Sequence, residues 1–219
     1  MICKGEISMT KKERAQFSID ALKELYPEVK CSLDYSTPLE MLLATQMSAQ
    51  CTDASVNRVT KTLFKKYTIA EDFANADLDE LQNDIRSIGL YRNKSKNIIA
   101  CCKKIIENYN GQVPDSMEDL LTLPGTGRKT ANLILGEIFG KPAVVVDTHC
   151  MRLSKRIGLT TNDTPEKIEK DLQKLIPPNE QLDFCHRLVY HGRAVCSSRN
   201  PKCNICTLKE FCKYGVKIK

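Results

Sequence analysis

The sequence has no long apolar run, no low-complexity segment and no repeat of fixed period. A helix that spans a membrane needs about 20 consecutive apolar residues, and no stretch approaches that length. Residues 1–16 lack the apolar core and the small-residue cleavage site of a secretory signal peptide. The sequence therefore predicts a soluble protein that stays in the cytoplasm and has no membrane partner.

Strand signals are almost as scarce. One β-like run, residues 143–146, is too short to build a sheet, and we expect it to be a buried connection. Apolar side chains recur instead at helical spacing in four stretches, formed by Val56, Val59, Leu63 and Tyr67; Ile98, Ile99, Cys102, Ile105, Ile106 and Tyr109; Ile168, Leu172, Leu175 and Ile176; and Leu182, Cys185, Leu188 and Val189. These patterns predict an all-α fold.

The composition is that of an ordinary globular protein, with 42% hydrophobic and 27% charged residues. A chain of 219 residues can form one large domain or two modest ones. Lysine and arginine exceed aspartate and glutamate by 33 to 27. The resulting net charge of +6 fits a nucleic-acid partner without requiring one.

The sequence contains 11 cysteines, an odd number. In a reducing cytoplasm such a set indicates metal ligands and buried thiols rather than disulfides. Four of them lie close together, with six, two and five residues between successive members: Cys196, Cys203, Cys206 and Cys212. Four thiolates at this density predict one metal site, and by ligand type alone either zinc or a four-iron cluster would fit.

A glycine-containing turn at residues 123–127 is followed at once by a helical pattern at 128–139. Gly125 and Gly127 permit unusual backbone dihedrals and a close approach to a partner. The first amides of the helix, beginning at Arg128, lack internal acceptors and carry partial positive charge. Such a turn predicts a phosphate cradle, and the alternative is a tight helical turn that binds nothing.

Three titratable residues of interest follow this turn. Lys129 lies in the first turn of the expected helix, where a lysine usually contacts phosphate as a point charge. It could instead act as an amine nucleophile, because the positive helix end and burial both favour the neutral amine. Asp147 follows the apolar run and precedes another expected helix, so we expect an N-cap, with a catalytic role left open. His149 is expected to be a packed or hydrogen-bonded histidine.

Residues 123–131 read Leu-Pro-Gly-Thr-Gly-Arg-Lys-Thr-Ala and are followed by Val-Asp-Thr-His at 146–149. These segments resemble the helix-hairpin-helix DNA glycosylases and, among them, the endonuclease III family. The resemblance covers nearly the whole chain and implies that Lys129 is the nucleophile and Asp147 the catalytic aspartate. The spacing of the four clustered cysteines is similar to that of the family's C-terminal iron–sulfur loop. This similarity implies a [4Fe-4S] cluster rather than zinc.

The resemblance also implies residues that bind DNA. Residues 47–53 resemble a family segment whose glutamine, here Gln50, fills the space left by an extruded nucleotide, and Leu90 matches an apolar wedge that enters from the opposite side. By residue type alone, we would expect the glutamine in solvent and the leucine in the core. The full set implied to bind DNA is Gln50, Leu90, Gly125, Gly127, Arg128, His149 and, from the basic segment around the cysteines, Arg193, Arg199 and Lys202.

Membership of this family would imply a bifunctional DNA glycosylase and abasic-site lyase of base excision repair. Such an enzyme removes oxidised pyrimidines and cleaves the strand 3′ to the abasic site by β-elimination. Its partner would be double-stranded DNA containing oxidised pyrimidines or abasic sites, and we expect a monomer associated with the nucleoid. Two alternatives are a monofunctional glycosylase and a non-catalytic helix-hairpin-helix DNA-binding protein with a metal knot.

The resemblance further implies two domains with a cleft between them. Residues 31–141 are expected to form a six-helix domain that includes the hairpin. Residues 1–30 and 142–219 are expected to form a helical domain from both termini that carries the iron–sulfur cluster.

Overall fold

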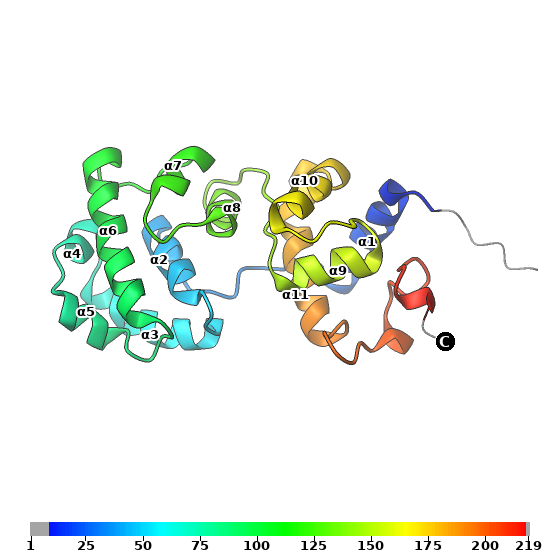
Figure 1. Ribbon diagram of the computed structural model, residues 1–219, viewed down its shortest axis with the longest axis horizontal. Coiled ribbons are helices and arrows are strands. Elements are labelled where there is room, and N and C mark those ends of the chain that lie inside the picture. The colour runs from blue at the N-terminus through cyan, green and yellow to red at the C-terminus, as the bar shows by residue number, and fades with distance from the viewer. Residues whose placement is uncertain (1–8, 218–219) are drawn as a thin grey trace, which may run out of the picture. The chain divides into compact units, whose positions relative to one another are not determined.

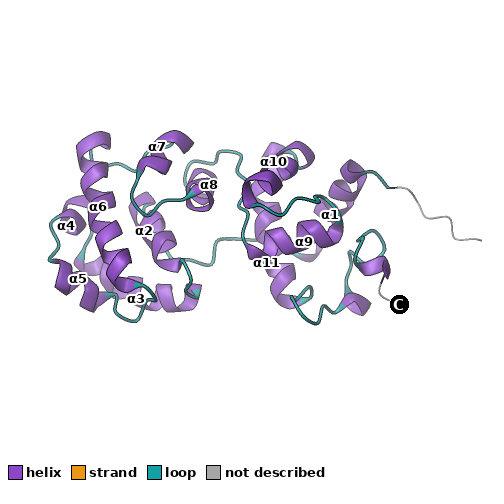
Figure 2. Ribbon diagram, viewed as in Figure 1, coloured by secondary structure: helices purple, strands orange, loops and turns teal. Residues whose placement is uncertain are grey.

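The computed structural model describes residues 9–217, which form helices joined by loops and contain no strand (Figure 2). The all-α fold predicted from the sequence is confirmed. In chain order the helices are α1 (Lys11–Leu25), α2 (Pro38–Ser48), α3 (Asp53–Lys66), α4 (Ala70–Ala74), α5 (Leu78–Asp84), α6 (Tyr91–Tyr109), α7 (Met117–Thr122), α8 (Arg128–Glu137), α9 (Thr148–Ile157), α10 (Pro165–Leu175) and α11 (Gln181–Ala194), with the short 3-10 helices η1 (Pro178–Glu180), η2 (Cys203–Ile205) and η3 (Gly215–Lys217).

The chain divides into two compact units. The central unit is the segment Cys31–Lys141, and the terminal unit combines the described residues up to Lys30 with those from Pro142 onward. The central unit holds seven helices, α2 to α8, where the family resemblance implied six. The outermost parts of the predicted terminal domain, residues 1–8 and 218–219, lie outside the described residues.

Helix α2 is the centre of the central unit. Its side chains are buried on all faces from Met41 to Met47, as expected for a helix with packing partners on every side. Helices α3, α6 and α8 pack against it (Figure 1). The helix begins where Thr37 Oγ1 accepts a hydrogen bond from Glu40 N at 3.2 Å and where Pro38 fills the first helical position. Both features are strong start signals.

Helix α6 is 19 residues long and packs on α4, α5 and α2. Its buried stripe includes Ile98, Cys102 and Ile105, which the sequence predicts at helical spacing. The backbone turns into and out of the helix through left-handed residues, Leu90 before it and Asn110 after it. The first of these two turns belongs to the candidate site described below.

The terminal unit is held together by α11, which packs on α1 and α9. Arg187 of α11 is only 1% exposed. Its guanidinium donates to Tyr26 O at 3.1 Å and pairs with Glu180 at 3.3 Å and Asp183 at 3.1 Å. A buried cation with its donors satisfied in this way fixes the relative placement of the elements it joins. The helix that precedes the central unit is thereby tied to those that follow it.

Ala143–Val146, the apolar run before α9, is buried and non-helical, so the predicted buried connection is confirmed. Between residues 9 and 217 no helix combines the length and the apolar character that crossing a membrane requires.

Candidate functional site

The predicted hairpin consists of α7, the turn at residues 123–127 and α8. Thr126 N donates to Leu123 O at 3.0 Å, which closes the turn over a buried leucine. Gly125 has a φ of +78°, a left-handed conformation that favours glycine. Gly127 caps α8, and a Cβ added there would meet nothing within 4 Å, so its backbone faces open space. The turn therefore presents bare backbone and the first amides of α8, from Arg128 on, an arrangement suited to phosphate.

Gln46 of α2 braces this hairpin, a role that the sequence motifs do not indicate. Its side chain is buried, and Nε2 donates to Pro124 O and to Thr126 Oγ1, both at 3.1 Å. A Cβ at Gly125 would lie 3.2 Å from Gln46 Cδ, so the close contact requires glycine as much as the backbone conformation does. One signal was available in the sequence: a glutamine inside a buried apolar helix must find a hydrogen-bond partner.

Lys129 occupies the second position of α8, and its side chain is exposed. Its charge has a small effect on the thiol of Cys31. The pKa of Cys31 is raised to about 11, chiefly by burial and also by Glu137 and Asp53, while a hydrogen bond with the Leu33 backbone and the positive charge of Lys129 act in the opposite direction. The Lys129 amine is thus accessible at the open end of the hairpin helix.

Asp147 caps α9 in the terminal unit. Its Oδ1 accepts a hydrogen bond from Cys150 N at 2.7 Å, so the predicted N-cap is confirmed. This hydrogen bond holds one oxygen of the carboxylate. Because the group is rigid, the orientation of its second oxygen is restricted too. Lys129 belongs to the central unit and Asp147 to the terminal unit.

His149 packs between α9 and α11, and the expectation of a packed, hydrogen-bonded histidine is confirmed. Arg152 Nη2 lies 3.1 Å from His149 Nδ1. Burial lowers the pKa of His149, the charge of Asp147 raises it, and the charges of Arg152 and Arg193 lower it. The neutral ring is therefore favoured at pH 7. A Cβ at Gly192 would collide with this ring, so glycine is needed at that point of α11.

Gln50 and Leu90 both have left-handed backbone, with φ of 56° and 61°. Residues other than glycine rarely adopt this conformation. Leu90 is 56% exposed, so the expectation that a leucine after glycine lies in the core is wrong. A Cβ at Gly89 would lie 3.7 Å from Gln50 O, so the two turns are neighbours. Together they present an exposed apolar side chain and an exposed amide on adjacent strained turns.

The four clustered cysteines line one cavity, together with residues that include Pro201, Lys209 and Tyr214. Among residues 9–217 no group of three or more His, Cys, Asp or Glu is spaced for a single metal ion, and no cysteine is in a disulfide. Burial raises the pKa of Cys206 to about 11 and also raises the pKa of Cys212. A bound cationic group would reverse this effect and hold both as thiolates.

Hydrogen-bond donors lie close to two of these sulfur atoms. Gly215 N donates to Cys212 Sγ at 3.4 Å, and Arg156 Nη1 lies 3.3 Å from Cys196 Sγ. Donors of this kind stabilise sulfur that carries negative charge. The shared cavity, the four thiols and the donors together fit an iron–sulfur group.

Two arginines tie α9 to the cysteine loop, which we define as residues 195–215. Arg152 donates from Nε and Nη2 to Cys196 O at 3.2 and 3.0 Å. Arg156 donates to Ser197 O at 2.6 Å and to Ser198 O at 2.7 Å. The sequence motifs do not identify either arginine, although their spacing of four places them on one face of α9.

The basic residues predicted around the cysteines are mostly exposed. Arg193 lies in the last turn of α11, and Arg199 lies in the cysteine loop. Lys202 is also exposed, but its Nζ donates to Ala194 O at 3.3 Å. The terminal unit therefore presents positive charge beside the cysteine cavity, which suits a phosphate backbone.

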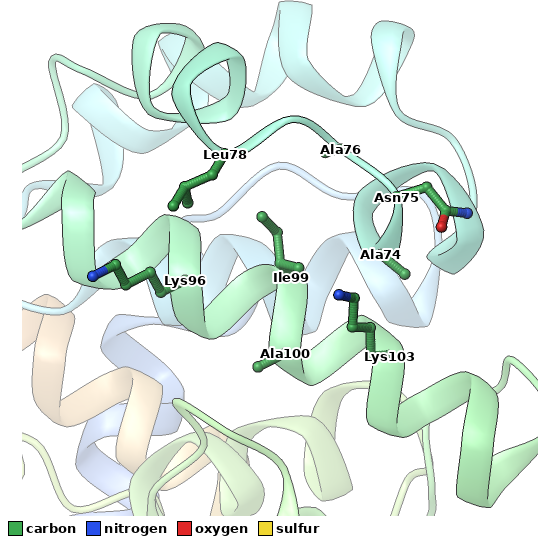
Figure 3. A pocket seen from close by; sticks show the side chains of 8 residues that line it. All are labelled: Ala74, Asn75, Ala76, Leu78, Lys96, Ile99, Ala100 and Lys103. Atoms are coloured by element: carbon green, nitrogen blue, oxygen red, sulfur yellow. The ribbon is translucent and has the colours of Figure 1, made fainter.

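A surface hollow of about 540 Å³ lies elsewhere, between α4, α5 and α6 (Figure 3). Leu78 and Ile99 form part of its floor, and Lys96 and Lys103 extend along it (Figure 3). None of the predicted site residues lines this hollow, and it plays no part in the candidate site.

Comparison with known proteins gives consistent matches. Residues 43–178, more than half of the chain, match the model of the HhH-GPD superfamily base excision DNA repair proteins. The chain is 51% identical to endonuclease III of Synechocystis sp. over 93% of both chains, and 46% identical to that of Bacillus subtilis over 94% of both. The structure is similar to that of a trapped endonuclease III–DNA covalent intermediate, with a TM-score of 0.91 and 44% identity over 95% of this chain and 99% of the other.

The hairpin brace leads to a prediction. Substitution Gln46→Leu removes the donor that Pro124 O and Thr126 Oγ1 share. Leaving such groups without a partner costs about 1–3 kcal/mol, so we expect the affinity for undamaged duplex DNA to fall about tenfold. The measurement is fluorescence anisotropy titration at two salt concentrations.

The matched control is Gln173→Leu. The side-chain amide of Gln173 donates to Glu169 at 3.3 Å, and both residues lie on α10, away from the hairpin in the sequence. It should bind DNA as the wild type does. Unchanged affinity and salt dependence in the Gln46→Leu protein would contradict the bracing role.

Proposed function

The chain belongs to the endonuclease III family, the bifunctional DNA glycosylases and abasic-site lyases that act on oxidised pyrimidines, and we propose that Lys129 and Asp147 carry out this chemistry here. The observation that carries the proposal is the accessible amine of Lys129 in the first turn of the hairpin helix. Nucleophilic attack requires an amine that the sugar can reach, and this one lies at the open end of α8. A related protein trapped as a covalent intermediate with DNA supports a covalent route.

The first chemical step exchanges one bond at the sugar for another. Lys129 Nζ bonds to C1′ as the glycosidic bond breaks, and the base leaves with the electron pair and takes up a proton. Asp147 stabilises the positive charge that develops on the sugar and accepts the proton that the amine loses. Its cap to Cys150 N holds the carboxylate in one orientation for both tasks.

The second step cleaves the strand. Ring opening gives a protonated Schiff base between Lys129 and C1′, which makes the C2′ proton acidic. Removal of that proton gives an enamine with a C1′=C2′ double bond. Its electrons then form a C2′=C3′ double bond as the C3′–O3′ bond breaks, so the 3′ phosphate leaves with the bonding pair and the iminium between Lys129 and C1′ forms again. Water finally hydrolyses the Schiff base and returns the free lysine.

We propose that binding precedes this chemistry through contacts that ignore base sequence. The hairpin amides, Arg128 and the basic residues Arg193, Arg199 and Lys202 hold phosphates, with His149 beside them. Gln50 and Leu90 enter the duplex while the damaged nucleotide turns out. Extrusion costs a few kcal/mol, and less for a lesion that stacks poorly.

The cofactor we propose is a [4Fe-4S] cluster held by Cys196, Cys203, Cys206 and Cys212. When bound, it would supply four iron–sulfur bonds that cross-link the cysteine loop. The chain's own residues then hold the loop against α9, since Arg152 and Arg156 bond its backbone carbonyls. The role that we propose for the cluster is to hold the basic surface of the loop in position. We further propose that the protein acts as a monomer on nucleoid DNA in the cytoplasm.

Borohydride trapping tests the covalent mechanism. Borohydride reduces a Schiff base to a stable amine, so the wild type should form a covalent adduct with a duplex that carries thymine glycol. Lys129→Gln should form none, and Asp147→Asn should form adduct about 10²-fold more slowly or worse. Lys141→Gln is the control, because Lys141 is a lysine of the same unit that pairs with Asp115 at 2.7 Å.

Base release without an adduct would indicate a monofunctional glycosylase. Neither release nor adduct on any oxidised pyrimidine would contradict the proposed substrate class and would favour a binding protein.

Metal analysis tests the cofactor. The purified protein should be brown and contain about four irons per chain, measured by a colorimetric iron assay. Cys203→Ser should lose iron and lower the melting temperature, because a ligand of the group is missing. Cys31→Ser, a half-buried thiol of the central unit, should keep its iron. Zinc in place of iron would show that the four thiolates hold a different metal.

A further inference from the structure

We infer that Lys94 is a positioning residue that locks the Gln50 turn and the Leu90 turn into a single wedge for opening the duplex. The inference rests on the proposed function, which gives Gln50 and Leu90 their place at the extruded nucleotide. It assigns to Lys94 a part in that step although the side chain itself is buried and meets no DNA.

Lys94 connects the two turns through both of its ends. Its backbone N donates to Leu90 O at 3.1 Å, in the first turn of α6. Its side chain runs inward, with only 6% of the residue exposed. There Nζ donates to Met47 O at 2.8 Å and to Ala49 O at 2.7 Å. One residue of α6 thus holds the end of α2 from which Gln50 follows.

Removing an ammonium group from water costs free energy, so a buried lysine is retained only where its contacts offset that cost. Burial lowers the pKa of Lys94, while the nearby Cys51 raises it. The last carbonyls of a helix lack intrahelical donors and carry partial negative charge. The ammonium of Lys94 supplies both the donors and the positive charge at the carboxyl end of α2. An apolar side chain of the same length would leave both carbonyls without these donors and without the positive charge.

The two turns need such support because each is strained. Gln50 and Leu90 are two of the three non-glycine residues with positive φ among residues 9–217. Backbone of this kind persists only where the surroundings over-determine it. Neither side chain provides its own anchor, because both are exposed. The conformation must therefore be imposed from behind, and Lys94 is the residue that contacts the backbone of both turns.

To open the duplex, the side chains of Gln50 and Leu90 must enter it at the same time. If Gln50 and Leu90 moved independently, ordering them would consume part of the binding free energy at every encounter. A common brace makes their spacing a property of the free protein. Lys94 should consequently affect how completely the duplex is opened at saturation more than how tightly the protein binds.

The test uses the metal-loaded protein and a duplex with a non-cleavable tetrahydrofuran abasic analogue opposite 2-aminopurine. Entry of the wedge unstacks the opposite base and raises its fluorescence, so no chemistry by Lys129 is required. We expect Lys94→Met to lower the equilibrium constant for opening about tenfold, the size associated with loss of a buried partner, and so to reduce the fluorescence rise at saturating protein. Lys104→Met is the matched control, because Lys104 also lies on α6 and donates to a backbone carbonyl, Thr122 O at 3.0 Å.

A double-mutant cycle separates positioning from general stability. In the Gln50→Ala protein, Lys94→Met should cause little additional loss, because the side chain that it positions is already absent. A purely structural role would give additive losses. If Lys94→Met fails to fold, Lys94→Arg keeps the charge but not the geometry, and it should show a reduced rise at saturation.

The outcomes are distinct. A wild-type rise with an unchanged rise in both the Lys94→Met and Lys94→Arg proteins, or additive losses in the cycle, would overturn the inference while the proposed function stands. No rise with the wild type would mean that Gln50 and Leu90 do not open the duplex, which removes that part of the proposed function and the inference with it.

Discussion

Burial of helix α2 on every face is the constraint on which the functional surface of the central unit depends. A helix enclosed from Met41 to Met47 cannot shift without disturbing α3, α6 and α8 together. Its polar contacts therefore act as fixed points. Gln46 reaches from it to the hairpin turn, and its carboxyl end delivers Gln50. The proposed phosphate cradle and the proposed wedge are therefore both held by the same rigid helix.

In the terminal unit, α9 has the corresponding role. Asp147 caps its amino end, and Arg152 and Arg156 bind the cysteine loop from further along the same helix. The carboxylate proposed for catalysis and the loop proposed to hold a cluster therefore share one support. This arrangement gives the cluster a structural reason to matter for activity without taking part in the reaction. Loss of the loop would remove the contacts of Arg152 and Arg156 from the helix that Asp147 caps.

The features that the sequence predicts well are those encoded within a few consecutive residues. The hairpin turn and the Asp147 cap each depend on local spacing, and so do the long helices. The metal site predicted at the four cysteines stays a prediction. The partners of residues that make distant contacts were not predictable, because no local pattern identifies them. Gln46 bonds a carbonyl 78 positions away, and Lys94 bonds one 47 positions away. Leu90 could be assigned only through the family resemblance, since a leucine after glycine gives no sign that it will be exposed.

We propose that one amine, that of Lys129, makes the bond to the sugar. Peptide mapping of the borohydride-reduced adduct by mass spectrometry locates the modified residue in the wild-type protein without any substitution. The deoxyribose remnant should be attached to Lys129, and other lysines, including Lys141 of the same unit, should remain unmodified. Attachment to any other amine would show that Lys129 is not the nucleophile, even if the protein removes bases and cleaves strands as its family does.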